Sequence, residues 1–402
     1  MRPFDGRRVL LGVTGGIAAY KSAALARDLT LAGAEVDVVL THSAREFVGT
    51  VTFEALTGRP VHDQLVAAGH ALDHIRLPRE ADVIVVAPAT ADFIARAATG
   101  RADDLLAACL LAAGKVPVLI VPAMNDRMWA HPQVQQNTAR LREIGYHVLA
   151  PDTGLLASRE EGSGPGRMPE PATIRSHIAR LIEPVSALTG KHIVVSAGPT
   201  REALDPVRFL SNHSTGKMGV AVAAAAWRRG AQVTLVAGPL DVAVPTGPDV
   251  VSVETTDEMA AAVRKALKKA DALIMAAAPA DFRAKSVAGQ KIKKGTSAPS
   301  LALEFTTDIL QATRDARRPG CIVVGFALET EKLEASALKK LEVKQLDLVV
   351  ANRVEEGSGF GADTNRVTLL GKDGSREELP LQGKVEVADA ILDRVAGLFH
   401  GR

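Results

Sequence analysis

Short apolar runs recur along the chain, and each is followed by a segment with the composition and spacing of a helix. Residues 7–41 read RRVLLGVTGGIAAYKSAALARDLTLAGAEVDVVLT, which predicts a strand, a turn of small residues, a helix and a second strand. A further apolar run, ADVIVVAPATADF, follows at 81–93. Apolar strands that alternate with helices are typical of parallel sheets covered by helices on both faces.

The second half of the chain repeats this layout. HIVVSAG at 192–198 predicts a strand, VAVAAAAWRRG at 220–230 a helix, and GAQVTLVAGP at 230–239 the next strand. The run DALIMAAAPADF at 271–282 corresponds to the later run of the first half. A short, turn-rich stretch, EPVSALTGK at 183–191, separates the two halves and predicts a domain boundary there.

We therefore predict an α/β protein with two doubly wound parallel-sheet domains. Residues 1–186 form a flavodoxin-like domain and residues 187–402 a Rossmann-like domain. Ligands of such sheets bind beyond the carboxyl ends of the strands. Two irregular stretches stand out: 152–171, which is too long for a connector and predicts a lid or a disordered segment, and 361–381, which predicts a hairpin with its turn at 372–374.

Composition narrows the classes of partner. The 402 residues are 47% hydrophobic and only 3% aromatic, and the net charge is +2 with the two signs interspersed. We expect no nucleic-acid partner, because base stacking needs aromatic side chains and a polyanion needs a basic patch. No apolar run approaches the roughly 20 residues that span a bilayer, and MRPFDGRR lacks a signal-peptide core, so we expect no membrane partner and a cytoplasmic protein. Cys109 and Cys321 suggest buried thiols rather than a disulfide.

Small and hydroxyl-bearing residues follow three strands of the first predicted domain. Gly15 and Gly16 come after the first strand, without the G-x-G-x-x-G spacing of dinucleotide folds. Thr41 and Ser43 follow the second strand, and PATAD at 88–92 follows a later one. Because no acidic ribose-binding residue comes after the second strand, this edge suits flavin mononucleotide (FMN) better than a dinucleotide. A tight strand-to-helix turn accounts for the glycine pair almost as well.

A long loop, DPVRFLSNHSTGKMG at 205–219, connects a strand to a helix in the second half. It carries Arg208, Asn212 and Lys217, and the helix after it begins with unpaired backbone N–H groups, so we expect an anionic ligand there. It is not a Walker A loop, because Lys217 is followed by Met218 rather than by Ser or Thr. The alternative is an ordinary surface loop that caps the helix.

Several motifs, taken in order, resemble known families. TGGIAAYK, DHI, APATAD and PAMNxxMW are similar to motifs of the flavoprotein decarboxylases that act on peptidyl or phosphopantothenoyl cysteine. DPVRFLSNHSTGKMG, AAPADFR, KIKK, GFALET and LDLVVAN resemble phosphopantothenate–cysteine ligase. Their fusion is similar to the bacterial bifunctional proteins of coenzyme A biosynthesis, and the resemblance covers nearly the whole chain.

The resemblance implies a ligase in the second domain. In that family CTP, with Mg²⁺, activates the carboxylate of phosphopantothenate as an acyl-cytidylate, and the amine of cysteine then displaces CMP. Lys291 matches the family lysine that offsets charge on the triphosphate, and Asn212 matches the asparagine that holds the acyl intermediate; Arg208 is a further candidate for substrate binding. The positions that match CTP contacts are Ala276, Ala277, Asp281, Lys291, Thr306, Thr307, Asp308, Ile309, Phe326, Lys340 and Lys344. The family often has Asn-Pro-Asp-Ile where this chain has TTDI at 306–309.

The resemblance also implies an FMN-dependent decarboxylase in the first domain. Such enzymes oxidise the terminal cysteine thiol of phosphopantothenoylcysteine, release CO₂ and reduce the resulting enethiolate to phosphopantetheine. His74 matches the family base and Asn125 the residue that anchors the substrate carboxylate. Taken alone, each is more often an ordinary hydrogen-bonding residue. The positions that match flavin contacts are Gly15, Gly16, Thr41, Ser43, Thr90, Ala91 and Ala123.

The lid departs from the family pattern. The family has a cysteine that protonates the enethiolate, whereas this chain reads LASREEGSGPGRM with no cysteine. When the family pattern is aligned from Leu156-Ala157, the position of the family cysteine is Ser158. When it is counted back from Arg167, that position is Glu160. Serine is too weak an acid to replace a thiol. Burial in a closed lid favours the protonated form of a carboxyl group, so we predict Glu160 or water as the donor and a solvated Glu161.

Two other functions remain open at this point. The first domain could be a flavin decarboxylase with an altered acid, or an FMN-binding regulatory or scaffold domain attached to an active ligase. Retention of both His74 and Asn125 favours catalysis, because FMN binding alone does not require that pair. The resemblance implies a homo-oligomer, with decarboxylase trimers and ligase dimers assembled into a dodecamer.

Overall fold

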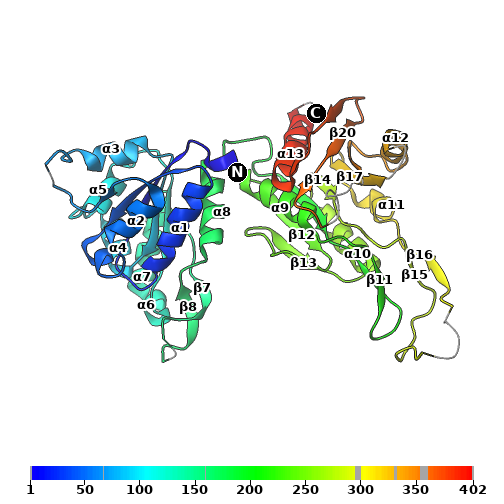
Figure 1. Cartoon of the computed structure of the whole chain (residues 1–402), viewed down its shortest axis with the longest axis horizontal. Coiled ribbons are helices and arrows are strands. Elements are labelled where there is room, and N and C mark those ends of the chain that lie inside the picture. The colour runs from blue at the N-terminus through cyan, green and yellow to red at the C-terminus, as the bar shows by residue number, and fades with distance from the viewer. Residues whose placement is uncertain are drawn as a thin grey trace. The chain divides into compact units, whose positions relative to one another are not determined.

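A computed structural model describes residues 2–66, 68–158, 160–294, 300–329, 333–353 and 361–400 of the chain. The chain divides into two compact units, Met1–Glu183 and Pro184–Arg402 (Figure 1). The division falls within the turn-rich segment 183–191, and each unit has its own sheet and its own cores.

The first unit is built on a six-stranded parallel sheet with the strand order β3-β2-β1-β4-β5-β6. All seven residues of β4 are buried, as expected for a central strand that is covered on both faces. The strands of the sheet are β1 (Arg8–Val13), β2 (Glu35–Leu40), β3 (Val61–His62), β4 (Val83–Ala89), β5 (Val118–Pro122) and β6 (His147–Val148).

Helices cover both faces of this sheet because alternate residues of its strands point to opposite sides. Leu11 of β1 belongs to the core under α1, α2 and α8, and Leu10 belongs to the core under α3, α4, α5 and α7. The helices are α1 (Ala19–Leu31), α2 (Thr50–Thr57), α3 (Asp73–Glu80), α4 (Ala91–Thr99), α5 (Leu105–Leu111), α6 (Asp126–Ala130), α7 (Pro132–Glu143) and α8 (Pro171–Ile182), with the 3-10 turns η1 (Arg2–Phe4) and η2 (His42–Glu46).

The second unit repeats this topology and extends it. Its sheet has eight strands in the order β13-β12-β9-β14-β17-β18-β20-β21, in which β13 to β18 pair in parallel and β20 and β21 are antiparallel. The strands of the sheet are β9 (His192–Ala197), β12 (Gln232–Ala237), β13 (Asp249–Ser252), β14 (Ala272–Met275), β17 (Ile322–Glu329), β18 (Leu348–Arg353), β20 (Val367–Gly371) and β21 (Arg376–Glu378).

Two hydrophobic cores lie on the two faces of this second sheet. One packs under α9 and α13, and the other under α10, α11 and α12. The helices are α9 (Lys217–Arg228), α10 (Thr256–Leu267), α11 (Ile309–Ala312), α12 (Leu333–Val343) and α13 (Lys384–His400), with the 3-10 turn η3 (Arg314–Ala316). None of the helices in the described ranges has the length and the apolar character needed to cross a membrane.

Small antiparallel ribbons stand apart from the two sheets. Each pairs two short strands: β7 (Asp152–Leu155) with β8 (Ser163–Arg167), β10 (Arg201–Ala203) with β11 (Phe209–Ser211), β15 (Phe282–Ala284) with β16 (Leu303–Phe305), and β19 (Thr364–Asn365) with β22 (Gln382–Gly383). The irregular stretch 152–171 thus contains the paired strands β7 and β8 and the start of α8, and the long loop 205–219 contains a strand that the sequence did not predict.

The prediction of two doubly wound parallel-sheet domains is confirmed, and so is the hairpin near 372–374, which β20 and β21 form. One detail needs correction. The first sheet has the 3-2-1-4-5-6 order of dinucleotide-binding folds, whereas flavodoxin has the order 2-1-3-4-5. The parallel strands of the second sheet have the same order as the first, so the repeat in the sequence corresponds to a repeated topology.

Candidate functional site

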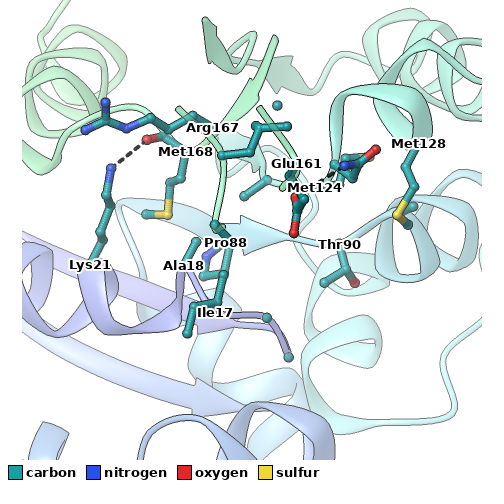
Figure 2. A pocket seen from close by; sticks show the side chains of 18 of the residues that line it. Ile17, Ala18, Lys21, Pro88, Thr90, Met124, Met128, Glu161, Arg167 and Met168 are labelled. Carbon is teal, nitrogen blue, oxygen red and sulfur yellow. Dashed lines mark hydrogen bonds between the residues drawn. The ribbon is translucent and has the colours of Figure 1, made fainter. Parts of the chain in front are cut away.

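The first unit contains a cavity of about 450 Å³ at the carboxyl edge of its sheet. A volume in this range suits a cofactor or a drug-sized ligand. The turns before three helices line it: Gly15 and Gly16 before α1, Thr90 before α4, and Asn125 before α6. Figure 2 shows Lys21 and Met168 at one side of the pocket, Met128 at the other side, and Glu161 between them.

A hydroxyl group holds two of these turns together. Thr14 Oγ1 donates a hydrogen bond to Pro88 O at 2.8 Å and accepts one from the Thr90 backbone N–H at 3.1 Å. Thr14 is 1% exposed, so it crosslinks the ends of β1 and β4 from within the protein. These two hydrogen bonds hold the turn that contains Gly15 and Gly16 next to Thr90. Sequence analysis missed Thr14, although its position just before the glycine pair is a usable signal.

Gly15 is required by a close approach of two chain segments. A Cβ atom placed on Gly15 would lie 2.5 Å from the Cβ of Ser43, closer than real Cβ atoms come. Ser43 is therefore held against the glycine turn, as predicted for residues at neighbouring strand ends. Thr41 is buried at the N-cap of η2, where its side chain accepts a hydrogen bond from the Ala44 N–H. Neither Thr41 nor Ser43 belongs to the described residues that line the cavity.

The start of α1 favours an anionic group. Ala18, its N-cap, offers no side-chain cap, and the first turn has no acidic residue. No side chain caps this 13-residue helix; the Ala19 and Lys21 N–H groups donate to the backbone oxygens of Gly16 and Ala18, next to the cavity lining formed by Gly15 to Ala18. Lys21, one turn further on, is 8% exposed and donates to Met168 O and to the carboxylate of Glu170, each at 3.0 Å. It ties α1 to the segment that follows the β7–β8 hairpin.

The β7–β8 hairpin covers one side of the cavity as a lid. Gly166 accepts a hydrogen bond at its carbonyl oxygen from the Met124 backbone N–H at 3.0 Å, and an added Cβ at Gly166 would lie 2.2 Å from Met124 O. An added Cβ at Gly164 would likewise lie 2.7 Å from the Cβ of Asp126. The glycines of the lid are therefore explained by its close packing against residues 124–126.

The lid places Glu161, rather than Glu160, in the pocket. The Nδ2 group of Asn125 donates a hydrogen bond to Glu161 Oε2 at 3.2 Å, and Glu161 lines the cavity. Glu160 is exposed and outside the lining. Ser158 Oγ accepts a hydrogen bond from the Glu161 N–H at 3.3 Å and so supports this turn. Both glutamates are exposed, as expected for Glu161, but Glu161 rather than Glu160 lies in the cavity lining. The role of Glu160 as proton donor stays a prediction.

Asn125 has two structural partners. Its side-chain oxygen caps α6 by accepting a hydrogen bond from the Arg127 N–H at 2.9 Å, while its Nδ2 group faces the lid. An N-cap of this kind contributes about 1 kcal/mol. The cap fixes the orientation of the amide, so that the donor end points to Glu161 and the acceptor end points to the helix.

His74 lies apart from this cavity. It is the second residue of α3, and its Nδ1 atom is buried without a hydrogen-bond partner among the residues that the structure describes. Its predicted partner, Asn125, lines the cavity, whereas His74 does not. The structure of one chain thus does not bring the two predicted catalytic residues into one cavity, and the role of His74 stays a prediction.

The lining residues fit a flavin. Apolar side chains line the cavity, the start of α1 has no side-chain cap and lies beside it, and a few polar groups belong to the lining. The apolar contributors are Ile17, Met124, Met128, Leu155, Leu156 and Met168. The predicted contacts Gly15, Gly16, Thr90, Ala91 and Ala123 all lie in the lining.

In the second unit, Asp205 joins two predicted binding loops. Its buried carboxylate accepts hydrogen bonds from the N–H groups of Val207, Arg208 and Ile292, at 2.8, 2.9 and 3.0 Å. Arg208 pairs with the same carboxylate and also donates to Ile292 O at 2.6 Å. Lys291 is exposed next to this anchor. The contacts of Arg208 thus join the loops, and its predicted contact with substrate stays a prediction.

These contacts also affect the ionisation of Asp205. Burial acts to raise its pKa, but the hydrogen bonds from Arg208 and from the three backbone N–H groups outweigh burial and hold the pKa well below its ordinary value. The carboxylate therefore stays charged at neutral pH and holds the two loops together. Sequence analysis did not single out Asp205, whose position at the start of DPVRF was the available signal.

Asn212 connects the long loop to the end of β14. Its Nδ2 group donates to Ala278 O at 3.1 Å and to Pro279 O at 3.0 Å. The predicted contacts Ala276 and Ala277 lie just before these carbonyls, and the Ala277 N–H is held by Ser196 Oγ at 3.1 Å. The amide of Asn212 must therefore exchange one carbonyl partner before it can donate to an acyl oxygen.

The other predicted CTP contacts form two linked groups. In the first, Thr306 N donates to Asp281 O at 3.1 Å, and Thr307 Oγ1 donates to Asp257 at 2.6 Å. In the second, Asp308 caps α11 and pairs with Lys344 at 3.0 Å. Ile309 is buried in the core beneath α11, and Lys340 Nζ donates to Phe326 O at 2.5 Å. These contacts show which residues lie next to one another. The roles of these residues in binding CTP stay predictions.

Both halves of the chain match known families. Residues 2–183 match the Flavoprotein family, and residues 188–398 match the DNA/pantothenate metabolism flavoprotein C-terminal domain. The fold and the pocket therefore belong to a flavoprotein unit fused to a second unit of pantothenate metabolism. This pairing agrees with the two sets of motifs found in the sequence.

Full-length relatives define the family more closely. The coenzyme A biosynthesis bifunctional protein CoaBC of Bacillus subtilis (strain 168) is 44% identical over 402 residues, with 98% of each chain covered. The protein of the same description from Mycolicibacterium smegmatis is 45% identical over 411 residues, covering 98% of this chain and 99% of the relative. A crystal structure of the C-terminal domain of such a protein is 39% identical and covers 54% of this chain and all of that chain, with a TM-score of 0.47.

The chain belongs to the family of coenzyme A biosynthesis bifunctional proteins. It is accordingly a bifunctional enzyme of coenzyme A biosynthesis, with the decarboxylase and ligase activities that its motifs imply.

Proposed function

We propose that the second unit joins phosphopantothenate to cysteine with CTP and Mg²⁺, and that the first unit, with FMN, decarboxylates the product to phosphopantetheine. The main support is the cavity in which the turns before α1, α4 and α6 meet a lid that carries an acidic side chain. Its apolar walls, and the start of α1 with no side-chain cap, suit a flavin with one phosphate.

In the first unit, FMN supplies two-electron redox chemistry when it is bound. We assign its phosphate to the start of α1 and its ring system to the apolar lining around Met124 and Met128. The Nδ2 group of Asn125 binds the carboxylate of the substrate's terminal cysteine, because it is a donor held in place by the helix cap. The β7–β8 lid lines one side of this position.

Glu161 is the proposed proton donor of the last step. Its carboxylate and the carboxylate of the substrate compete for the same donor, Asn125 Nδ2. When substrate takes that hydrogen bond, Glu161 is displaced but stays in the lid beside the reacting end. From there its carboxyl group can deliver a proton to the substrate.

In the second unit, the roles divide between two loops. Lys291 offsets the negative charge that develops on the triphosphate in the first half-reaction, and Asn212 stabilises the acyl oxygen in the second. Mg²⁺ accompanies the triphosphate. The Asp205 anchor at Ile292 supports this assignment, because it fixes the loop of Lys291 against the loop of Asn212.

One experiment tests both halves. The purified full-length chain is incubated with phosphopantothenate, cysteine, CTP and Mg²⁺, and the products are followed by mass spectrometry together with release of CO₂. We expect CMP, CO₂ and phosphopantetheine, and a yellow protein that releases FMN on denaturation. Phosphopantothenoylcysteine as the end product, without CO₂ from FMN-loaded protein, would replace the decarboxylase by a regulatory or scaffold domain.

The oligomeric state and the location are separate proposals. Family resemblance suggests decarboxylase trimers joined through ligase dimers, and native mass spectrometry would test for the resulting dodecamer. A cytoplasmic location likewise stays a prediction.

A further inference from the structure

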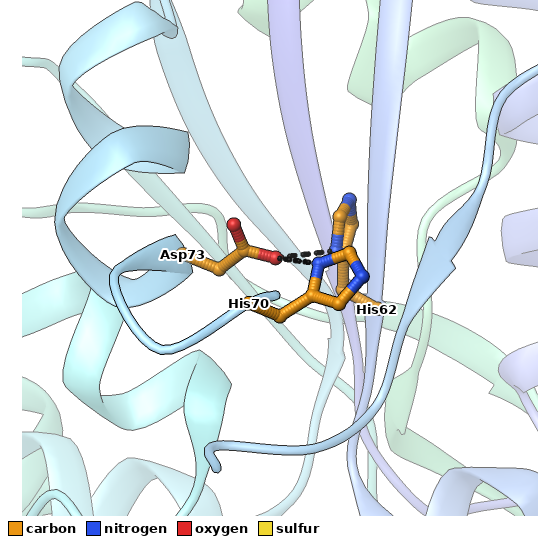
Figure 3. A group of neighbouring side chains, drawn as sticks. All are labelled: His62, His70 and Asp73. Atoms are coloured by element: carbon orange, nitrogen blue, oxygen red, sulfur yellow. Dashed lines mark hydrogen bonds and ion pairs between the residues drawn. The ribbon is translucent and has the colours of Figure 1, made fainter. Parts of the chain in front are cut away.

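Two imidazole groups and one carboxylate converge at the start of α3, and none of the three residues lines the flavin pocket. His62 ends β3, His70 lies in the following segment, and Asp73 begins α3. The Nδ1 atoms of His62 and His70 lie 3.0 and 2.9 Å from the same oxygen, Asp73 Oδ2 (Figure 3). The three candidate ligand atoms all lie within 4.8 Å of one another.

The surroundings hold this group in a fixed arrangement. The second oxygen of Asp73, Oδ1, accepts hydrogen bonds from Arg76 at 2.9 and 3.1 Å, which leaves Oδ2 directed at the two imidazoles. The side chains of Asp73 and His62 are 7% and 10% exposed, whereas His70 is 54% exposed. The group therefore has a rigid, buried side and an open side through which an ion can enter.

We propose that His62, His70 and Asp73 form a binding site for a divalent transition-metal ion of the Zn²⁺ class. Two imidazole nitrogens and one carboxylate oxygen are ligands that such ions prefer, and hard ions such as Mg²⁺ prefer oxygen ligands alone. Ligand atoms around a tetrahedral Zn²⁺ ion lie about 3.3 Å apart, so the distances of 2.9 and 3.0 Å need only small shifts.

Binding would exchange the His70–Asp73 hydrogen bond and the His62–Asp73 ion pair for three metal–ligand bonds. A proton held on Nδ1 of either imidazole moves to Nε2 or to solvent, and the Nδ1 lone pair binds the ion. Arg76 then donates to the oxygen of Asp73 that does not bind the ion and so orients the carboxylate, an arrangement typical of metal sites.

The ion would connect the end of β3, the chain at His70 and the first turn of α3. His74 is the residue that follows the ligand Asp73 in that turn. Metal binding would therefore stabilise the backbone that carries His74. Only this consequence rests on the proposed decarboxylase function; the site itself does not.

The test uses the full-length chain, freed of metal by chelation and kept without nucleotide. Co²⁺ binding is followed by its visible absorption, and Zn²⁺ binding by competition with Co²⁺. We expect one site per chain with nitrogen-containing coordination, and at least about 100-fold weaker binding for His62→Ala and His70→Ala, because even outer-shell changes cost 10–100-fold. His147→Ala, which removes an exposed imidazole elsewhere in the same unit, should leave binding unchanged.

A conservative variant separates a ligand from a structural residue. His70→Asp supplies another metal ligand, so it should retain more binding than His70→Ala, while circular dichroism reports whether each variant is folded. Absence of tight Co²⁺ or Zn²⁺ binding to the wild-type chain, or equal binding by wild type and the folded His70→Ala variant, would overturn the proposal. Neither result would bear on ligation or on CO₂ release.

Discussion

The backbone N–H of Ile292 donates a hydrogen bond of 3.0 Å to Asp205 Oδ2, although 87 positions separate the two residues. Arg208 strengthens the connection by donating both to the same carboxylate and to Ile292 O. Because Lys291 immediately precedes Ile292, one buried carboxylate determines where the proposed phosphate-binding lysine lies relative to the long loop.

This relationship predicts a specific loss of ligation in Asp205→Asn. The amide keeps the size of the side chain but removes its charge and one acceptor, so the Lys291 loop is no longer held. Misplacement of about 1 Å can cost about 100-fold in rate. We expect a fall of up to that size in acyl-cytidylate formation, measured in single-turnover experiments with CTP. Asp249→Asn, on the exposed strand β13, is the matched control, and an equal effect in both variants would contradict the anchoring role.

The same carboxylate predicts a pH dependence. The pKa of Asp205 is lowered in the folded protein, so the stability that it contributes is present above its unfolded value and is lost as pH falls through the folded value. We expect the Ile292 amide to stay protected from hydrogen exchange from neutral pH to about pH 4 and to lose protection only below it, after correction for intrinsic exchange. Loss of protection between pH 7 and pH 5 would show that another group holds the loop.

Two substitutions should separate the half-reactions of the ligase. Lys291→Gln should abolish acyl-cytidylate formation, because no other charge replaces the lysine at the triphosphate. Asn212→Asp should let the intermediate form and accumulate, because a carboxylate cannot donate to the acyl oxygen; loss of one such donor costs about 3 kcal/mol. Quenched-flow mass spectrometry would detect the intermediate. Its absence from both variants would contradict separate roles.

His74 and Asn125 should affect only CO₂ release. His74→Asn and Asn125→Ala remove the proposed base and carboxylate donor, whereas the ligase unit has its own cores. Asn125→Ala also removes the cap of α6, so Asn125→Ser serves as a control that keeps a capping hydroxyl but no amide. We expect both substitutions at 125 to block CO₂ release while ligation continues. Restored activity in Asn125→Ser would assign the effect to the cap.

The sequence predicts the two parallel sheets well because their strands are buried on both faces, so their apolar runs are continuous. Gly15 and Gly16 were also recognisable, since a turn at a strand end needs small residues. Contacts between distant segments could not be recognised in the sequence. The hydrogen bonds of Thr14 and Asp205 can be seen only when the fold brings their partner segments together. The sequence likewise did not predict that Glu161 lines the cavity, because the direction of a side chain in a turn depends on backbone geometry that counting along a motif does not provide.

The lid therefore leads to a prediction about Glu161. Its carboxylate accepts the hydrogen bond of Asn125 Nδ2, so it lies where the carboxyl end of the substrate is proposed to bind. Glu161→Gln cannot supply an acidic proton, and we expect CO₂ release to continue while the unreduced enethiol product accumulates, as measured by mass spectrometry. Glu160→Gln is the matched control, since Glu160 is exposed and outside the cavity lining, and it should yield phosphopantetheine at the wild-type rate. Ser158→Ala removes the acceptor that supports the Glu161 turn and should slow the last step without stopping it. Full phosphopantetheine yield from the Glu161→Gln protein would leave water, or a residue outside the lid, as the proton donor.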